Sequence, residues 1–233
     1  MDSQQISDSK LAGDTEVMDS RQQPVWHVLV LGFFTFNLYT AYWLFKTYSD
    51  LKREATEVLG PYEDAAASAA GISAAVLKPI PPRNPAFHPD EHTRETLRTF
   101  WRVNPALRTV GMLIPVVQIY IAATLTLGLA NLVPGANSFP RRKPIVATLL
   151  VAFGFFAALT LGYLNHGYWM LASVAMIPVA VLQHWLNRYW DAVESADLMV
   201  RHGFNLWEMI TIIIGASIIG LSIAGLMIGV KMH

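Results

Sequence analysis

Residues 144–187 read PIVATLL VAFGFFAALT LGYLNHGYWM LASVAMIPVA VLQHWLN and contain no Asp, Glu, Lys or Arg. Residues 22–45, 109–140 and 209–230 are also free of these four residue types. A helix that crosses a bilayer needs about 20 consecutive, mostly apolar residues. Each of the four windows is at least that long, so the sequence predicts an all-α, polytopic membrane protein.

The composition of the whole chain favours the same class. Of the 233 residues, 53% are hydrophobic and 15% are charged, whereas an ordinary soluble domain carries about 25% charged residues. The 17 basic and 17 acidic side chains cancel, so no net charge attracts nucleic acid or another polyanion. The chain has no cysteine, which excludes disulfides and thiolate metal sites. We therefore expect neither a soluble globule, nor a disordered chain, nor a nucleic-acid-binding protein.

The charge-free windows divide into five hydrophobic segments. Residues 165–167 (Asn-His-Gly) split the longest window, which predicts three clear transmembrane helices at about 145–164, 168–187 and 209–230. Segments 25–45 and 111–133 complete the set. If all five segments cross, the two sides hold 7 and 10 basic residues, but if these two dip in and return the split is 16 to 1. Cytoplasmic loops carry the excess of basic residues, so we expect segments 25–45 and 111–133 to be broken or re-entrant. The chain would then cross a bacterial inner or intracytoplasmic membrane three to five times, with its most basic loops in the cytoplasm.

Both doubtful segments contain a reason to break. Asn37 follows an aromatic, β-branched run, and Asn tolerates the left-handed conformation that ends helices. Pro115 removes a backbone donor and clashes with the preceding turn. Residues 37–41 (NLYTA) and 118–122 (QIYIA) also match at a spacing of 81, which makes Gln118 and Tyr120 the counterparts of Asn37 and Tyr39. Two kinked but ordinary spans are the alternative.

The chain divides into five predicted regions. Residues 1–24 form a polar, mobile leader that lacks the basic start and apolar run of a secretory signal. Residues 25–60 hold the first hydrophobic segment and an exit helix that Gly60 and Pro61 should stop. An Ala- and Pro-rich linker spans 61–88, a surface amphipathic helix spans 89–108, and a helical membrane bundle spans 109–233.

A basic stripe marks the predicted surface helix. Arg94, Arg98 and Arg102 follow one another at four-residue spacing, and Leu97, Phe100 and Trp101 lie on another flank. Such a helix can lie on a membrane with its arginines at the lipid phosphates. The alternative is a solvated face that only orients the protein.

Small residues recur every four positions in two of the segments. Small side chains at this spacing let helices approach closely in lipid. We expect both stripes to contact partner helices or lipid. They consist of Gly154, Ala158 and Gly162, and of Ala216, Gly220 and Ala224.

Residues 35–46 read TFNLYTAYWLFK and resemble the signature of an uncharacterised bacterial membrane-protein family, known only as a domain of unknown function. Its pattern is Thr-x-Gly-x-Tyr-x-x-Tyr-Trp-x-Tyr/Phe-Lys/Arg, and Asn37 stands where the family usually has Gly. The resemblance implies a multi-pass membrane protein with no agreed activity, and it lends no catalytic residue. The matching positions are Thr35, Tyr39, Tyr42, Trp43 and Lys46.

Few residues offer candidate chemistry. His27 and His184 would lie near one leaflet, where they could ligate haem or a chlorophyll-type pigment, or simply form hydrogen bonds. Residues 88–92 (HPDEH) have the letter pattern of an inverted zinc protease, but a solvated helix start explains them better, so no metal site is expected. The hydrophobic segments lack the charges that transport paths use. No catalytic residue is predicted, and we expect a non-enzyme.

The leading functional prediction is therefore an accessory or scaffold subunit of a larger membrane complex. It would pack against lipid and against the helices of other subunits or of a second copy. The alternative is a small-solute channel or carrier, in which Asn37 and Gln118 would face a common cavity.

Overall fold

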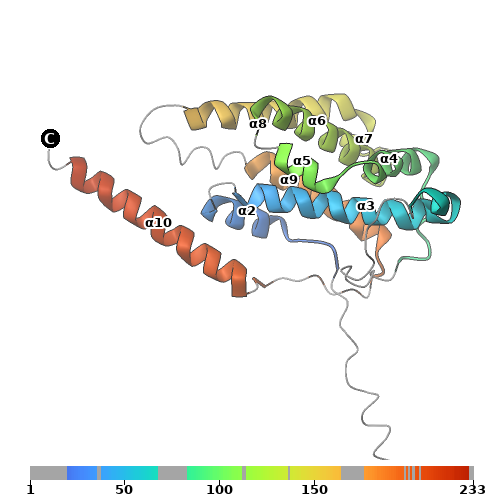
Figure 1. The fold of residues 1–233 in the computed structure, drawn as a ribbon, viewed down its shortest axis with the longest axis horizontal. Helices are drawn as coiled ribbons and strands as arrows, with labels where there is room; N and C mark the ends of the chain where they lie inside the picture. Colours follow the sequence, from blue (N-terminus) through green and yellow to red (C-terminus); the bar gives the residue numbers. More distant parts are fainter. Residues whose placement is uncertain are drawn as a thin grey trace, which may run out of the picture.

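The computed structural model is all-helical over the residues that it describes, which are 20–35, 38–67, 83–111, 114–135, 137–163, 176–196, 198, 200, 203–204 and 206–230. Its helices are α2 (Val25–Phe34), α3 (Leu38–Ala67), α4 (Glu91–Trp101), α5 (Pro105–Gly111), α6 (Pro115–Leu132), α7 (Phe139–Arg142), α8 (Pro144–Tyr163), α9 (Met176–Val193) and α10 (Leu206–Val230). Figure 1 shows α10 running away from the other helices.

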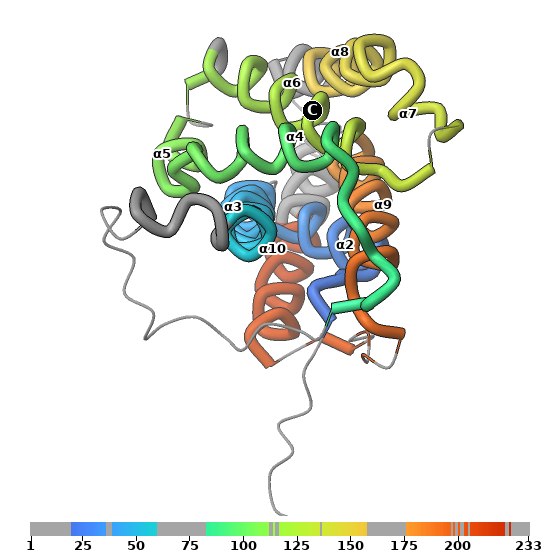
Figure 2. Tube along the Cα trace, turned by 90° about the vertical axis from the view of Figure 1, so that its right-hand side faces the viewer, coloured from blue at the N-terminus to red at the C-terminus, as the bar shows by residue number. Residues whose placement is uncertain are grey.

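The remaining helices form a layered bundle. Viewed end-on, α6 and α8 lie on one side, α4 and α5 lie in the middle, and α2 and α3 lie on the other side (Figure 2). α3 packs against α4 and α5, α4 packs against α6, and α6 packs against α8. α9 contacts α2, α6 and α8, so it connects the two outer layers.

Helix α3 shows how the sequence pattern builds this core. Leu44, Tyr48, Leu51 and Ala55 are spaced 4-3-4, which places them on one face of a helix, and all four are buried. Val58 continues this face and packs against the core. One face of α3 is therefore buried along this spacing, but α3 continues past Gly60 and Pro61 to Ala67, so the predicted stop at these residues is wrong.

Helix α4 lies on the bundle. Its N-cap is Asp90, whose side chain accepts a hydrogen bond from the Thr93 N–H at 2.8 Å. Partial burial alone would raise the pKa of Asp90, but hydrogen bonds from Thr93 and an ion pair with Arg141 outweigh it and lower the pKa to about 2. Leu97 and Phe100 are buried where α4 contacts α3 and α6, so the apolar flank faces other helices of this chain.

Among the helices that the described residues form, none combines the length and the apolarity that a bilayer crossing requires. The prediction of a polytopic membrane protein with spans at 145–164, 168–187 and 209–230, and with 25–45 and 111–133 crossing or re-entering, is therefore wrong. The predicted multi-pass location in a bacterial membrane receives no support from the structure.

The apolar runs instead supply the interior of the bundle. Leu125 and Leu129 of α6, Val151 of α8, and Val179 and Leu182 of α9 are all buried in one core. α9 extends to Val193, beyond the predicted end at residue 187, and residues 168–175 of the predicted span lie outside the described residues. Part of the charge-free length therefore marks helix-to-helix contacts, which bury apolar surface, whereas many apolar side chains of α8 and α10 stay exposed.

The first expected helix break falls between α2 and α3, but the second segment is not interrupted, because α6 runs unbroken from Pro115 to Leu132. α2 ends at Phe34 and α3 begins at Leu38, with Asn37 outside the described residues. The Thr35 hydroxyl donates to the Leu31 carbonyl at 2.7 Å and accepts from the Tyr39 N–H at 2.9 Å, so it satisfies groups at the end of one helix and the start of the next. α6 begins at Pro115, which suits the first helical position because the ring fixes φ and lacks an N–H.

Candidate functional site

A cluster of four charged side chains lies where α3 and the end of α9 meet two non-helical segments. The Arg21 guanidinium bridges two carboxylates: its Nη1 lies 2.9 Å from Glu54 Oε2, and its Nε lies 2.8 Å from Glu194 Oε1. Arg83 forms a second ion pair with Glu54. Glu54 is fully buried, and Glu194 is 3% exposed. Two positive and two negative charges therefore balance inside the protein.

Aromatic rings close around this ion cluster. The Arg21 guanidinium carbon lies 3.9 Å from the centre of the Trp190 ring, a cation–π geometry that favours a desolvated arginine. Burial alone would lower the pKa of Arg21, but the charges and hydrogen bonds of Glu54 and Glu194 raise it above its ordinary value. Burial, followed by the charge of Glu54, raises the pKa of Tyr189 well above its usual range.

Further hydrogen bonds hold three of these four segments together. The Arg21 N–H donates to Glu194 Oε1 at 3.1 Å, and the Ser20 hydroxyl donates to the other oxygen of Glu194. The Asn84 N–H donates to the Val193 carbonyl at 2.8 Å, beside the bridge that joins residues 83 and 194. Glu194 follows the last residue of α9, where the helix dipole disfavours a carboxylate, so Arg21 supplies the compensating charge.

A ladder of amide side chains continues from the ion cluster into the bundle. Gln183 Nε2 donates to Asn187 Oδ1 at 2.6 Å, and Asn187 Nδ2 donates to the Gln23 carbonyl at 2.8 Å. The Gln23 N–H donates to Asn187 Oδ1 at 3.2 Å. Trp43 donates from its indole to Gln183, and Gln23 donates to the Tyr39 hydroxyl. Residues 20–24 are thus fastened to α3 and α9 along their length.

Chemically, the ion cluster and the amide ladder are suited to holding segments together. Glu54 is fully buried and already has two arginine partners, so a substrate in solvent has no access to its carboxylate. Buried polar groups that are satisfied in this way fix one arrangement of the chain. We regard the cluster as a clamp between residues 20–24, residues 83–84, α3 and α9.

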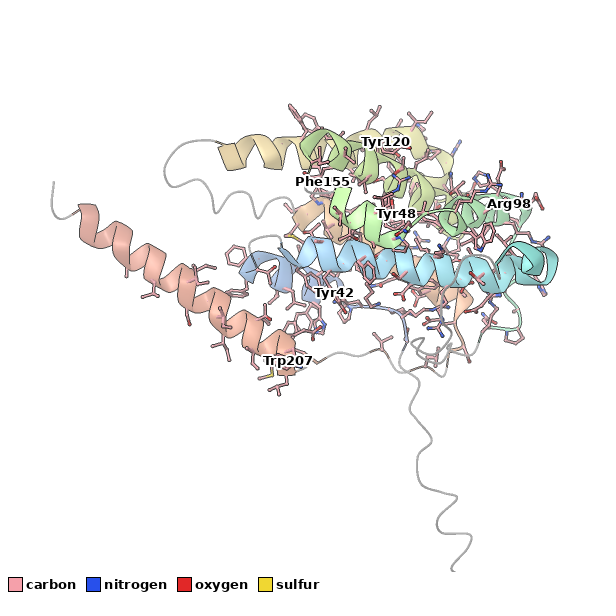
Figure 3. The ribbon with its side chains drawn as sticks, in the orientation of Figure 1. Tyr42, Tyr48, Arg98, Tyr120, Phe155 and Trp207 are labelled. Carbon is pink, nitrogen blue, oxygen red and sulfur yellow. The ribbon has the colours of Figure 1, made fainter. Side chains whose placement is uncertain are left out.

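The resemblance motif at residues 35–46 contributes to this clamp. Tyr39 and Trp43 are buried and enter the amide ladder. Tyr42 is 57% exposed and points away from the bundle (Figure 3). Lys46 pairs with Asp50 at 2.8 Å on the helix surface. The motif therefore places alternate aromatic side chains inside and outside.

The two candidate cofactor histidines have different environments. His27 is fully buried, stacked on Phe204 with ring centres 4.3 Å apart, and set edge-on to Trp26. His184 is exposed on α9. Within the described residues, no group of three or more His, Asp or Glu side chains is placed to hold a metal ion. Haem or pigment ligation by His27 or His184 stays an untested prediction.

The predicted basic stripe divides between two surface hollows. Arg98 lines both of them. Arg102 and Arg108 line a hollow of about 580 Å³ between α4 and α5. Arg94 lines the other, of about 460 Å³, together with Glu57 and Glu91; burial, followed by the charge of Glu54, raises the pKa of Glu57. Arg108 was not among the predicted site residues, because it lies beyond the four-residue spacing of the stripe.

The small-residue stripes also have different surroundings. At Gly154 a Cβ would lie 2.8 Å from the Pro178 ring, so this glycine serves the contact between α8 and α9. For Ala158 and Gly162 of α8, the structure does not describe the surroundings. Gly220 has open space around it, and Ala216 and Ala224 are exposed. The stripe on α10 is thus not covered by the described part of this chain.

The two segments of the predicted channel do not meet in a described cavity. Asn37 lies outside the described residues, and Gln118 is half-buried on α6. Gln118 lines neither of the two hollows above. Tyr120, its neighbour in the repeated motif, is 59% exposed. The channel or carrier therefore stays an untested alternative.

Large apolar side chains project from two helices. On α8, Ile145, Leu149 and Phe153 are each at least 64% exposed. On α10, Leu206, Trp207 and Ile213 are at least 62% exposed, and Figure 3 shows Trp207 projecting at the start of the helix. Contiguous apolar surface of this kind is rare on a protein that works alone and marks an interaction surface.

Sequence reasoning did not select the residues of the ion cluster. One signal was available: Glu54 is three residues after Leu51 and four before Val58, so it lies on the apolar face of α3. A carboxylate on a buried face needs a partner. The partners, Arg21 and Arg83, come from regions interpreted as leader and linker, and only the tertiary fold brings them to it.

Comparison of the chain with protein-family models, with curated proteins and with solved structures found no match.

Proposed function

We propose that this protein is a non-enzymatic scaffold or accessory subunit that assembles through α10, and that its partner there is the α10 of a second copy. The observation that carries the proposal is an apolar seam on α10, defined by Leu206, Met209, Ile213, Ala216 and Gly220. All five positions are exposed. They are spaced 3-4-3-4, the pattern by which two helices pack side chain into gap.

The seam faces away from the rest of the chain. α10 contacts the bundle through α2, and a Cβ at Gly215 would overlap the Phe34 carbonyl. At 100° per residue, the seam positions lie between about 100° and 180° around the helix from Gly215. The side that docks on α2 and the side that we assign to the partner are therefore different sides of one helix.

The seam is complementary to itself in antiparallel orientation. In such a pair the first position of each seven-residue repeat faces the fourth position of the partner's repeat. This register places Ile213 opposite Ala216 and Met209 opposite Gly220, so these two large side chains each meet a small residue, and the twofold axis repeats both contacts. Alternating large and small residues across an interface is how helices fill space without voids.

Ile213→Glu in the full chain tests this function. The carboxylate would be buried opposite Ala216 without a partner, which is unfavourable, so we expect the dimer dissociation constant to rise by about tenfold or more. Sedimentation equilibrium over a range of concentrations gives the mass. The matched control is Ile214→Glu, the same change at the next residue, which is 56% exposed but lies outside the seam.

The proposal requires the wild-type chain and the Ile214→Glu variant to show the mass of two copies at concentrations where Ile213→Glu shows one. A wild-type chain that is monomeric at every concentration contradicts it. Equal dissociation of both variants also contradicts it, because an added charge would then separate the two copies whether or not it lies in the seam.

A further inference from the structure

We infer that the hollow between α4 and α5 binds a phosphate group, carried either by a soluble phosphate compound or by a lipid headgroup. Its volume is about 580 Å³. Arg98 lines it from α4, Arg102 from the residue that follows α4, and Arg108 from α5, and Glu95 is the one carboxylate among its described lining residues. This excess of arginine is separate from the α10 seam and does not depend on it.

The backbone fixes the angle at which these arginines converge. The Val103 N–H donates to the Phe100 carbonyl at 3.1 Å where α4 ends. Asn104 starts the next helix, because its Oδ1 accepts from the Leu107 N–H at 3.2 Å. Lys52 Nζ of α3 donates to the Val103 carbonyl at 3.2 Å, which fastens the segment between α4 and α5 to α3.

Two of the arginines have no acidic partner. The Arg108 guanidinium lies 5.2 Å from the centre of the Tyr120 ring, and its Nη1 is 3.5 Å from the Thr124 hydroxyl. Both contacts are neutral, and they hold the side chain in place. Within the described part of the chain neither Arg108 nor Arg102 forms an ion pair with a carboxylate.

Phosphate is the anion that this arrangement suits best. Each guanidinium presents a planar fork of N–H donors that matches two phosphate oxygens, and such paired, charge-assisted hydrogen bonds are among the strongest in proteins. Thr99 and Asn104 add neutral polar groups to the lining. Figure 3 shows Arg98 on α4, on the side of the molecule where the hollow lies.

The second hollow shows why charge balance decides the assignment. It is lined by Glu57 and Glu91 as well as by Arg83, Arg94 and Arg98. Arg83 is already paired with the buried Glu54, so the carboxylates there offset the remaining cations. An anion would gain little in that hollow, and we assign no ligand to it.

The first test is a titration of the full chain with inorganic phosphate, in which calorimetry measures binding. A parallel flotation assay measures binding of the chain to vesicles. One vesicle preparation is pure phosphatidylcholine, and the other contains phosphatidic acid in addition. We compare the wild type with Arg102→Gln/Arg108→Gln. The control is Arg142→Gln/Arg188→Gln, which removes the same charge from two exposed positions elsewhere.

We expect saturable binding that the Arg102→Gln/Arg108→Gln variant weakens by about tenfold or more and the control leaves unchanged. Binding of free phosphate with this dependence supports a soluble ligand. Binding only of the acidic vesicles with this dependence supports a lipid headgroup. If the half-buried Arg108 is needed for folding, the exposed Arg102→Gln alone must show the loss.

Three results overturn the inference. The first is the absence of saturable binding both to phosphate and to the acidic vesicles. The second is an equal loss in the control variant, which would show that general charge attracts the anion. The third is full binding by a folded Arg102→Gln/Arg108→Gln variant.

Discussion

Glu54 connects more segments of this protein than any other described carboxylate, because its two oxygens receive Arg21 from one end of the chain and Arg83 from another segment. Removing a charge from water costs several kcal/mol, and only close partners offset that cost. The cluster supplies two arginines for two glutamates. Its contribution is therefore to fix one arrangement of four segments, since any other would leave a buried charge alone.

Replacing Glu54 by Gln should lower the free energy of unfolding by about 3–5 kcal/mol, because Arg83 then loses its carboxylate partner and Arg21 keeps only Glu194. Urea unfolding at neutral pH, followed by tryptophan fluorescence, measures the change. Glu57→Gln is the control: the Glu57 carboxylate is 4.0 Å from Arg53, and we expect a change below about 1 kcal/mol. Equal effects of the two substitutions would contradict the clamp.

At the scale of single residues, the sequence singled out some of the side chains that form contacts in the structure. Thr35, Tyr39 and Trp43 belong to a motif that stood out by its aromatic spacing, and the structure shows what they contact. The ion cluster could not be predicted, because a sequence shows that Glu54 needs a partner but not which arginine supplies it. Pairings between residues as far apart as Arg21 and Glu194 exist only in the folded chain.

At the scale of single helices, the residue types near a helix end predicted some of the boundaries. The end of α2 at Phe34 and the start of α6 at Pro115 agree with local residue types, since Pro acts on the backbone directly, but α6 then runs unbroken to Leu132, so the predicted break within that segment is wrong. The stop at Gly60 was not correct, because α3 continues to Ala67 through Pro61. A glycine followed by proline favours a helix end, but tertiary context overrides such preferences.

The docking of α10 on α2 depends on Gly215, because a Cβ at this position would overlap the backbone of Phe34. Gly215→Ala should therefore separate the two helices, although alanine is the better helix former. Hydrogen exchange of the α2 amides reports the loss as faster exchange. Ser217→Ala is the control, because it is a small change at an exposed residue of α10 outside the seam. Unchanged α2 protection in Gly215→Ala would show that this contact does not hold α10.

At the scale of the whole molecule, the length of the apolar runs was interpreted as membrane spans, and that interpretation was wrong. A charge-free run shows that a segment avoids water, but not whether lipid, its own chain or another protein covers it. Here much of α6 and α9 is covered by neighbouring helices. The exposed faces of α8 and α10 are the parts that this chain leaves uncovered.

The absence of cysteine in the chain makes the α10 seam open to a direct test. Met209→Cys and Gly220→Cys chains are prepared separately and then mixed under mild oxidation. In the antiparallel register residue 209 of one copy faces residue 220 of the other, within the roughly 7 Å between Cα atoms that a disulfide allows. Equivalent residues lie 11 positions apart along the helix pair, or about 16 Å, too far to bridge.

Cross-linking in the mixture, with little in either chain alone, is the result that this account predicts. Cross-linking of each variant with itself would mean a parallel pair. No cross-linking in any sample would mean that the seam does not join two copies.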